Sequence, residues 1–171
     1  MKASCLYLSI VSIIMPIFFA FGNFVAAQDY YNHTETPKET LSLYLGAMRE
    51  HNTNPDLPIY TEQSKQMLKA WKVTPSQMDN MVRSYSSCTP DEAKFDSSYL
   101  YAVIRYPINQ KQCSPWFFQK VGDVWKLDLT MMQKAVLFDN KNRWHFVPGV
   151  SHRYGFAFSD WTIDINGYPT E

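Results

Sequence analysis

The sequence has no excess of either charge. Its 171 residues include 16 lysines and arginines and 16 aspartates and glutamates, so the formal net charge at neutral pH is zero. A protein that binds nucleic acid or an anionic membrane surface usually carries a basic excess, which supplies its electrostatic footprint. The overall composition offers no such footprint, and we expect no nucleic-acid partner.

Short catalytic motifs are also missing. The chain contains no Gly-x-Ser-x-Gly turn, no Ser-x-x-Lys pair, no phosphate-binding loop and no Gly-x-Gly-x-x-Gly. These are the local signatures of common hydrolases, nucleotide-binding proteins and dinucleotide-dependent enzymes. There are no internal repeats and no low-complexity tracts. We therefore predict no cofactor and assign no catalytic residue.

Long apolar runs are absent after the first 27 residues. The run from Leu6 to Phe21 follows the basic residue Lys2 and precedes the small residues Val25-Ala26-Ala27, a pattern typical of a secretory signal peptide. A retained membrane anchor is the alternative, but the run is short for a bilayer, which needs about 20 residues. We predict a cleaved signal peptide over 1–27, a flexible arm over 28–35, and an exported, periplasmic or secreted protein without an integral membrane segment.

Cysteine is scarce, with three in the whole chain. Cys5 lies in the predicted signal peptide, which leaves Cys88 and Cys113. An even pair in an exported protein indicates a disulfide bond. Neither residue belongs to a Cys-x-x-Cys motif, and two cysteines cannot complete a structural zinc site. We predict a structural disulfide and no metal.

Three helices are predicted in the first half of the chain. Thr36-Pro37-Lys38-Glu39 is a capping box with proline at the first helical position, and Thr74-Pro75-Ser76-Gln77 repeats this logic. Thr61 is a candidate N-cap between them. Apolar residues at helical spacing follow each start; they are Leu41, Tyr44, Leu45 and Met48, then Met67, Leu68 and Trp71, then Met78, Met81, Val82 and Tyr85. We interpret these stripes as core packing.

After Cys88 the apolar period changes to two. The stretch "YLYAVIRYP" places Leu100, Ala102, Ile104 and Tyr106 on one strand face and Tyr99, Tyr101, Val103 and Arg105 on the other. "WFFQKVGDVWKLDL" predicts a hairpin with its turn at Gly122-Asp123. A shorter strand is expected near 93–96. Helices followed by an antiparallel sheet define an α+β fold.

This order resembles the nuclear transport factor 2-like superfamily, in particular its small exported bacterial members. The likeness rests on "TPKETLSLYLGAMREHN", on the three helices, and on "YLYAVIRYP" followed by "WFFQKVGDVWKLDL", and it covers residues 35–129. It implies a cone: a curved antiparallel sheet wrapped around helices, often with a pocket in its mouth. No catalytic set of that superfamily matches this chain residue by residue. We expect one domain over 36–171, with a cone-like core over 36–129.

Residues 130–171 form a β-rich C-terminal extension in this interpretation. "TMMQKAVLF" fits a short helix or a strand, and "DNKNR" predicts a turn. In "YGFAFSDWTIDINGYP" the apolar parity changes at Ser159-Asp160, which predicts strands separated by a bulge or a turn, with Ile163 and Ile165 facing inward. A metal site of His145, His152, Asp160 and Asp164 is possible, but the spacing matches no common ligand motif.

Two classes of function remain. The first is a non-catalytic exported module of the cell envelope that binds an unknown protein partner, an envelope component or a small molecule. Its binding surface would be an exposed sheet face with Tyr99, Tyr101 and Arg105, because aromatic and arginine side chains dominate binding hot spots. The second is a small-molecule carrier or enzyme that uses a pocket in the cone mouth, with Tyr44, Trp71, Tyr101 and Asp128 as candidate residues. The sequence favours the first, and a homodimer is possible. A deep pocket with buried acid or tyrosine groups would favour the second.

Overall fold

The computed structural model describes residues 34–170; the predicted signal peptide and the arm up to residue 33 lie outside the described residues. Its centre is an antiparallel sheet with the strand order β1-β2-β3-β4. The strands are Lys94–Phe95, Tyr101–Ile104, Trp116–Val121 and Val124–Leu127. The predicted hairpin is confirmed, and Gly122 in its turn has φ +62°, a left-handed conformation that favours glycine. The α+β class is confirmed.

Three helices precede the sheet, as the sequence predicts. They are α2 (Pro37–Arg49), α3 (Glu62–Ala70) and α4 (Pro75–Tyr85). The side chains of Thr36 and Thr74 each accept a hydrogen bond from the backbone N–H three residues later. The side chains of Glu39 and Gln77 in turn accept a bond from the backbone N–H of Thr36 and Thr74, so both capping boxes form. These caps satisfy N–H groups that the first helical turn leaves unpaired, which fixes where the helices begin.

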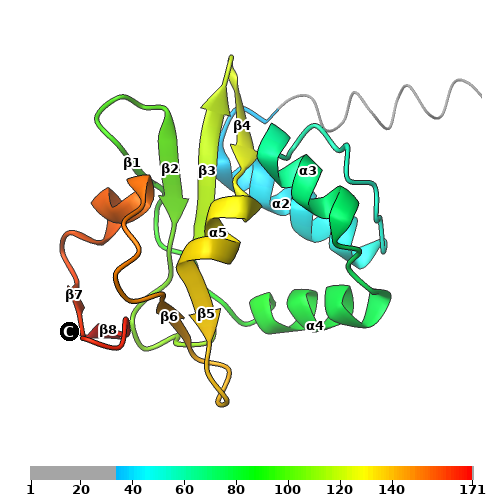
Figure 1. Cartoon of the computed structure of the whole chain (residues 1–171). Coiled ribbons are helices and arrows are strands. Elements are labelled where there is room, and N and C mark those ends of the chain that lie inside the picture. The colour runs from blue at the N-terminus through cyan, green and yellow to red at the C-terminus, as the bar shows by residue number, and fades with distance from the viewer. Residues whose placement is uncertain (1–33, 171) are drawn as a thin grey trace, which may run out of the picture.

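Both faces of the sheet are buried, and alternate residues of β2 and β3 enter different cores. Ala102 and Phe118 pack in the core that α2 and α4 cover, whereas Val103 and Phe117 pack in a second core with the C-terminal segment. Figure 1 shows α2, α3 and α4 on one side of the sheet and the C-terminal segment, in orange and red, on the other. The extension after residue 129 therefore completes the sheet's second face.

The stretch "TMMQKAVLF" forms both of the predicted alternatives in succession. Helix α5 (Leu129–Ala135) is followed directly by strand β5 (Val136–Phe138), which pairs with β6 (Trp144–Phe146) across the predicted turn. Because the helix takes residues 130–135 of this segment and the strand takes 136–138, neither period extends over the whole sequence pattern. The helix begins where Asp128 caps the backbone N–H of Met131, so β4 ends at Leu127.

The C-terminal extension is less β-rich than predicted. Residues Arg153–Phe158, expected to be a strand, form the 3₁₀ helix η1, which buries Tyr154, Ala157 and Phe158. The predicted break at Ser159-Asp160 is a turn, followed by the short strands β7 (Thr162–Ile163) and β8 (Pro169–Thr170). Ile165 is 91% exposed, so its predicted inward orientation is wrong: it lies in the turn between β7 and β8, not in a long strand.

The free edge of β4 is covered by two segments from much earlier in the chain, one at Thr34 and one at residues 59–61. Leu127 donates its N–H to Ile59 and accepts a bond from the N–H of Thr61, while Trp125 donates to the carbonyl of Thr34. Thr34 is buried, and its hydroxyl donates to the carbonyl of Trp125, so this residue of the predicted flexible arm is anchored. No helix within residues 34–170 combines the length and the apolar character needed to cross a bilayer.

Candidate ligand-binding cavity

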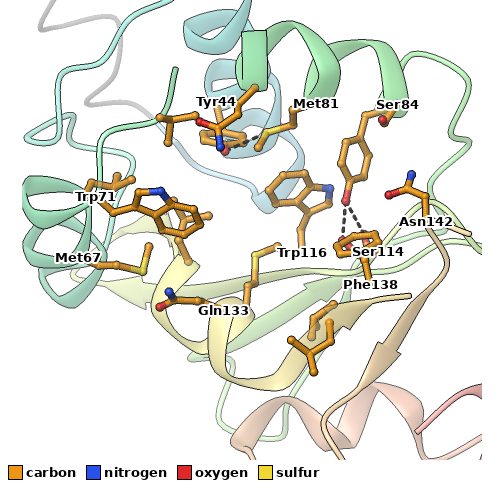
Figure 2. A pocket seen from close by; sticks show the side chains of 18 of the residues that line it. Tyr44, Met67, Trp71, Met81, Ser84, Ser114, Trp116, Gln133, Phe138 and Asn142 are labelled. Atoms are coloured by element: carbon orange, nitrogen blue, oxygen red, sulfur yellow. Dashed lines mark hydrogen bonds between the residues drawn. The ribbon is translucent and has the colours of Figure 1, made fainter. Parts of the chain in front are cut away.

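A cavity of about 500 Å³ lies between α3, α4, α5 and β5. Figure 2 shows Trp71 and Met67 from the end of α3 on one wall, Met81 and Ser84 from α4 on a second, and Gln133 and Phe138 from α5 and β5 on a third. Trp116, from the first position of β3, forms the inner end with Tyr44 of α2. The volume falls in the range of about 300–1,000 Å³ that is typical of small-molecule sites.

The lining is apolar and uncharged. Of the side chains that line the cavity, none is acidic or basic. Apolar and aromatic groups form most of the wall, namely Tyr44, Met67, Leu68, Trp71, Val73, Met81, Tyr85, Trp116, Leu129, Met132, Val136, Leu137 and Phe138. The neutral polar groups are Gln77, Ser84, Gln112, Ser114, Gln133 and Asn142. Such a wall favours an uncharged ligand, because an ion would lose its hydration without gaining a counter-charge.

Two tyrosines provide hydroxyls inside the cavity wall, and both are already hydrogen bonded. Tyr44 donates to the Sδ atom of Met81 at 3.0 Å, and the Tyr85 hydroxyl lies 2.6 Å from the Ser114 hydroxyl. Burial raises the pKa of both phenols well above the ordinary value. The two groups therefore stay neutral at physiological pH, and the cavity presents weak hydrogen-bonding groups without charge.

Three large apolar side chains at the cavity mouth reach solvent. Trp71 is 48% exposed, and Leu137 and Phe138 are 46% and 49% exposed. Trp71 caps the end of α3, whereas Leu137 and Phe138 belong to β5. The cavity is therefore open to solvent, and its exposed lining combines these apolar groups with the neutral amides Gln77, Gln112, Gln133 and Asn142.

The structure brings two of the sequence-predicted site residues to the cavity. Tyr44 and Trp71 line it. Tyr99, Tyr101, Arg105 and Asp128 do not. Tyr99 is exposed and stacks on Phe95, with ring centroids 4.4 Å apart. Tyr101 is half-buried on the second sheet face, where Arg153 donates to its hydroxyl.

Arg105 is 7% exposed, so the expectation of an exposed position is wrong. Its guanidinium makes two bonds of 2.6 Å to the carboxylate of Asp160 and donates to the carbonyl of Ala157 at 2.7 Å. The ring of Trp161 lies 4.4 Å from the guanidinium carbon. These partners all belong to the C-terminal extension, which covers the sheet face on which Arg105 lies. Arg105 holds that extension in place.

Asp128 caps a helix and binds a buried tyrosine. One carboxylate oxygen accepts from the backbone N–H of Met131, and the other accepts from the hydroxyl of Tyr154 at 2.9 Å. Tyr154 is fully buried and stacks on Phe117, and burial raises the pKa of its phenol. Asp128 therefore links α5 to η1 and does not point into the cavity.

Removing the Tyr154 hydroxyl tests this structural role. We expect Tyr154→Phe to lower the free energy of unfolding by about 1–2 kcal/mol, because a charge-assisted bond is lost while the half-buried Asp128 is partly rehydrated. Urea denaturation measures the effect, and Tyr99→Phe on the exposed surface is the control. Equal stability of wild type and Tyr154→Phe would contradict the assignment.

Cys88 and Cys113 form the predicted disulfide bond. Among the described residues, no three His, Cys, Asp or Glu side chains are grouped so that they could hold a metal ion. Of the candidates considered from sequence, His152 packs 5.4 Å from the ring of Phe117, Asp160 binds Arg105, and Asp164 accepts backbone bonds in the final turn.

Sequence reasoning missed most of the cavity wall because it assigned the helical stripes to the core. In α4, Met78 is buried in the core, but Met81, three residues later, lines the cavity. One signal was present: Met67, Met81 and Met132 all line the cavity, and methionine is enriched at adaptable binding surfaces because its side chain is flexible and polarisable.

No protein-family model, curated protein or solved structure matches this chain.

Proposed function

We propose that the protein binds a small, uncharged, mainly apolar molecule in the cavity between α3, α4, α5 and β5. The observation that carries the proposal is the uncharged, largely apolar lining of a cavity of about 500 Å³ that is open to solvent. The sequence alone favours an interaction module over a small-molecule carrier. A deep pocket with buried acid or tyrosine groups is the feature that would favour the carrier instead. Tyr44 and Tyr85 in the wall are such groups, so the carrier alternative now has the stronger support.

Ligand discrimination in this cavity would come mainly from shape. The apolar wall accepts any molecule whose hydrophobic surface fits it, because burial of apolar area is not directional. Orientation would depend on the neutral amides and hydroxyls, of which Ser84 and Asn142 lie toward one end in Figure 2 and Gln133 lies on the opposite wall. The proposed ligand therefore has an apolar body and at most a few uncharged polar groups.

The neutral fluorescent probe N-phenyl-1-naphthylamine tests the proposal. We expect saturable binding of one probe per chain, with a blue shift of its emission. Ser84→Trp should weaken binding at least about tenfold, because the larger side chain fills the cavity from α4. Asn80→Trp is the matched control, since Asn80 lies one turn earlier on α4, is exposed and does not line the cavity.

Probe binding that fails to saturate would overturn the proposal. Equal affinity for Ser84→Trp and Asn80→Trp would also do so, because the probe would then bind elsewhere. Far-ultraviolet circular dichroism of both variants establishes that the helices are intact.

We also propose that the chain is exported and cleaved after Ala27, and that its fold is related to the nuclear transport factor 2-like cone. The disulfide supports export, because such bonds persist mainly in oxidising compartments. Helices that precede and cover an antiparallel sheet, with a cavity at one end, support the relationship. Intact mass measurement of the protein from its own host tests the cleavage site: a first residue other than Gln28 would contradict it.

A further inference from the structure

The cavity mouth has the side-chain chemistry of a membrane interface. Trp71, Leu137 and Phe138 are each close to half exposed, and all three line the cavity. Tryptophan and other large apolar side chains are typical of segments that insert at the level of lipid headgroups, where an apolar ring meets hydrocarbon and its polar edge stays hydrated. These three side chains belong to the exposed part of the cavity lining, past which an apolar ligand would enter.

Basic residues outnumber acidic ones among the sequence neighbours of the cavity-lining residues, although the whole chain is neutral. Five basic residues directly adjoin a cavity-lining residue in sequence, are exposed, and form no ion pair within residues 34–170; they are Lys72, Arg83, Lys111, Lys134 and Lys141. The acidic residues that directly adjoin a cavity-lining residue in sequence are Asp128 and Asp139. Both are engaged, Asp128 by Tyr154 and Asp139 by Arg143.

The unpaired charge among the sequence neighbours of the lining residues is therefore positive, and it includes Lys72, next to Trp71 at the mouth. Lys69 also adjoins the lining, but Asp56 neutralises it at 2.8 Å. An exposed apolar rim with unpaired basic side chains beside it matches a surface of anionic headgroups over hydrocarbon. Overall neutrality conceals this local charge, because the compensating carboxylates lie elsewhere in the chain.

We propose that the cavity mouth docks on a lipid bilayer that contains anionic headgroups, and that the ligand enters the cavity from that bilayer. Trp71, Leu137 and Phe138 lie at the hydrocarbon boundary, while Lys72 and Lys134 contact phosphates. The route of entry rests on the proposed ligand binding, whereas the docking itself does not. A second copy of the chain fits this face less well, because two such mouths would bring like charges together.

Vesicle sedimentation tests the docking. The chain beginning at Gln28 contains every described residue and lacks the N-terminal apolar run, which would itself partition into lipid. We expect it to pellet with vesicles of equal parts phosphatidylcholine and phosphatidylglycerol and to pellet much less with phosphatidylcholine alone. Added salt should release it, because screening weakens the attraction between exposed charges.

Two double variants separate the apolar and the charged contributions. Leu137→Ser with Phe138→Ser should lower the partition coefficient at least about tenfold by removing the inserting side chains. Lys72→Glu with Lys134→Glu should lower it by about 25-fold or more, since each basic group near an anionic surface contributes about fivefold. Ile165→Ser controls for the loss of exposed apolar surface away from the cavity, and Arg49→Glu with Lys120→Glu has the same net charge as the lysine pair.

Equal losses in the lysine pair and its charge-matched control would overturn the docking face, because net charge alone would then explain the binding. Wild-type protein that stays in the supernatant with the mixed vesicles would overturn it as well. Self-association that depends on Leu137 and Phe138, without vesicle binding, would assign the face to a second copy instead. Naphthylamine binding by the lysine pair should be unchanged, so docking can fail while the proposed function holds.

Discussion

Replacing Cys88 and Cys113 together by alanine is expected to lower the free energy of unfolding by about 3–4 kcal/mol. The bond closes a loop with a sequence separation of 25, and cross-linking a loop of this size removes about that much conformational freedom from the unfolded chain. Denaturation by urea, with wild type and variant compared at the same temperature, measures the loss. For a domain of this size it is a large share of the total stability.

The same change should weaken ligand binding several-fold. Cys88 follows the end of α4, and Cys113 immediately precedes Ser114, which lines the cavity, so the bond holds the α4 wall against the inner end of the cavity. Without the disulfide, the hydrogen bond between Tyr85 and Ser114 remains as a link between α4 and the inner end of the cavity, and the two are positioned less firmly. A ligand would then have to order the site as it binds, which costs affinity.

Reduced wild-type protein provides the decisive control. In the presence of a strong thiol reductant, wild type should become as unstable as the double alanine variant, and the variant should not respond. Ser87→Ala, beside Cys88 on the exposed surface, should stay within about 0.5 kcal/mol of wild type. A loss below about 1 kcal/mol in the double variant would show that the bond closes a loop already ordered in the unfolded state.

The predictable parts of the fold are those that depend on neighbours in sequence. The capping boxes at Thr36 and Thr74 place the helix starts because they satisfy backbone donors locally. The turn at Gly122 places the hairpin because its backbone conformation favours glycine. The disulfide follows from the number of cysteines and from the predicted export of the chain.

The parts that could not be predicted depend on distant packing. Phe156 and Phe158 alternate as in a strand, yet the segment coils so that Tyr154 and Ala157, three residues apart, are both buried against the second sheet face. Arg105 has the alternation of an exposed strand position, but residues more than fifty positions later cover it. A six-residue pattern contains too little information to predict such a covering segment.

The cavity is hidden in the sequence for a different reason. An apolar side chain contributes the same pattern to a helix whether it faces packed core or an open cavity. Met78 and Met81 belong to one stripe of α4, and only the separation of α4 from α5 and β5 decides that Met81 borders empty space. Sequence periodicity therefore identifies the inner face of a helix but not whether that face is filled.

Asp160→Asn is expected to lower the free energy of unfolding by about 3 kcal/mol. The change leaves the guanidinium of Arg105 buried with weaker acceptors, and removing one partner of a buried ion pair typically costs about 3–5 kcal/mol. We expect the lower end because Asp160 is half-exposed and because Asp91 lies 3.6 Å from Nε of Arg105. Asp123→Asn, in the exposed hairpin turn, is the matched control and should change stability by less than about 0.5 kcal/mol.

Substitution of Arg105, the partner of Asp160, should lower the free energy of unfolding by less. Arg105→Met places an apolar side chain in the covered site, and the half-exposed Asp160 keeps Lys94 at 2.8 Å, so no charge is left buried and unpaired. We expect a loss of about 1–2 kcal/mol. Adding Asp160→Asn to Arg105→Met should then cost almost nothing more, which makes the double variant more stable than Asp160→Asn alone. Additive losses would contradict the coupling between the two side chains.

Acid unfolding tests the ion pair between Arg105 and Asp160 without a substitution, because low pH changes only the charge of the carboxyl group. Hydrogen bonds from Arg105 and then Lys94 hold the pKa of Asp160 well below the ordinary value. A carboxyl group with a lowered folded-state pKa stabilises the protein above its unfolded pKa of about 4, and that contribution is lost as the pH falls further. Asp96 and Asp139 also have lowered pKa values, so several groups titrate together in this range. The informative quantity is the difference in stability between wild type and Asp160→Asn, which should be constant above about pH 5 and shrink below pH 4. In that range the unfolded wild-type chain takes up a proton at Asp160 that the folded protein takes up only at much lower pH, whereas the asparagine variant has no such group.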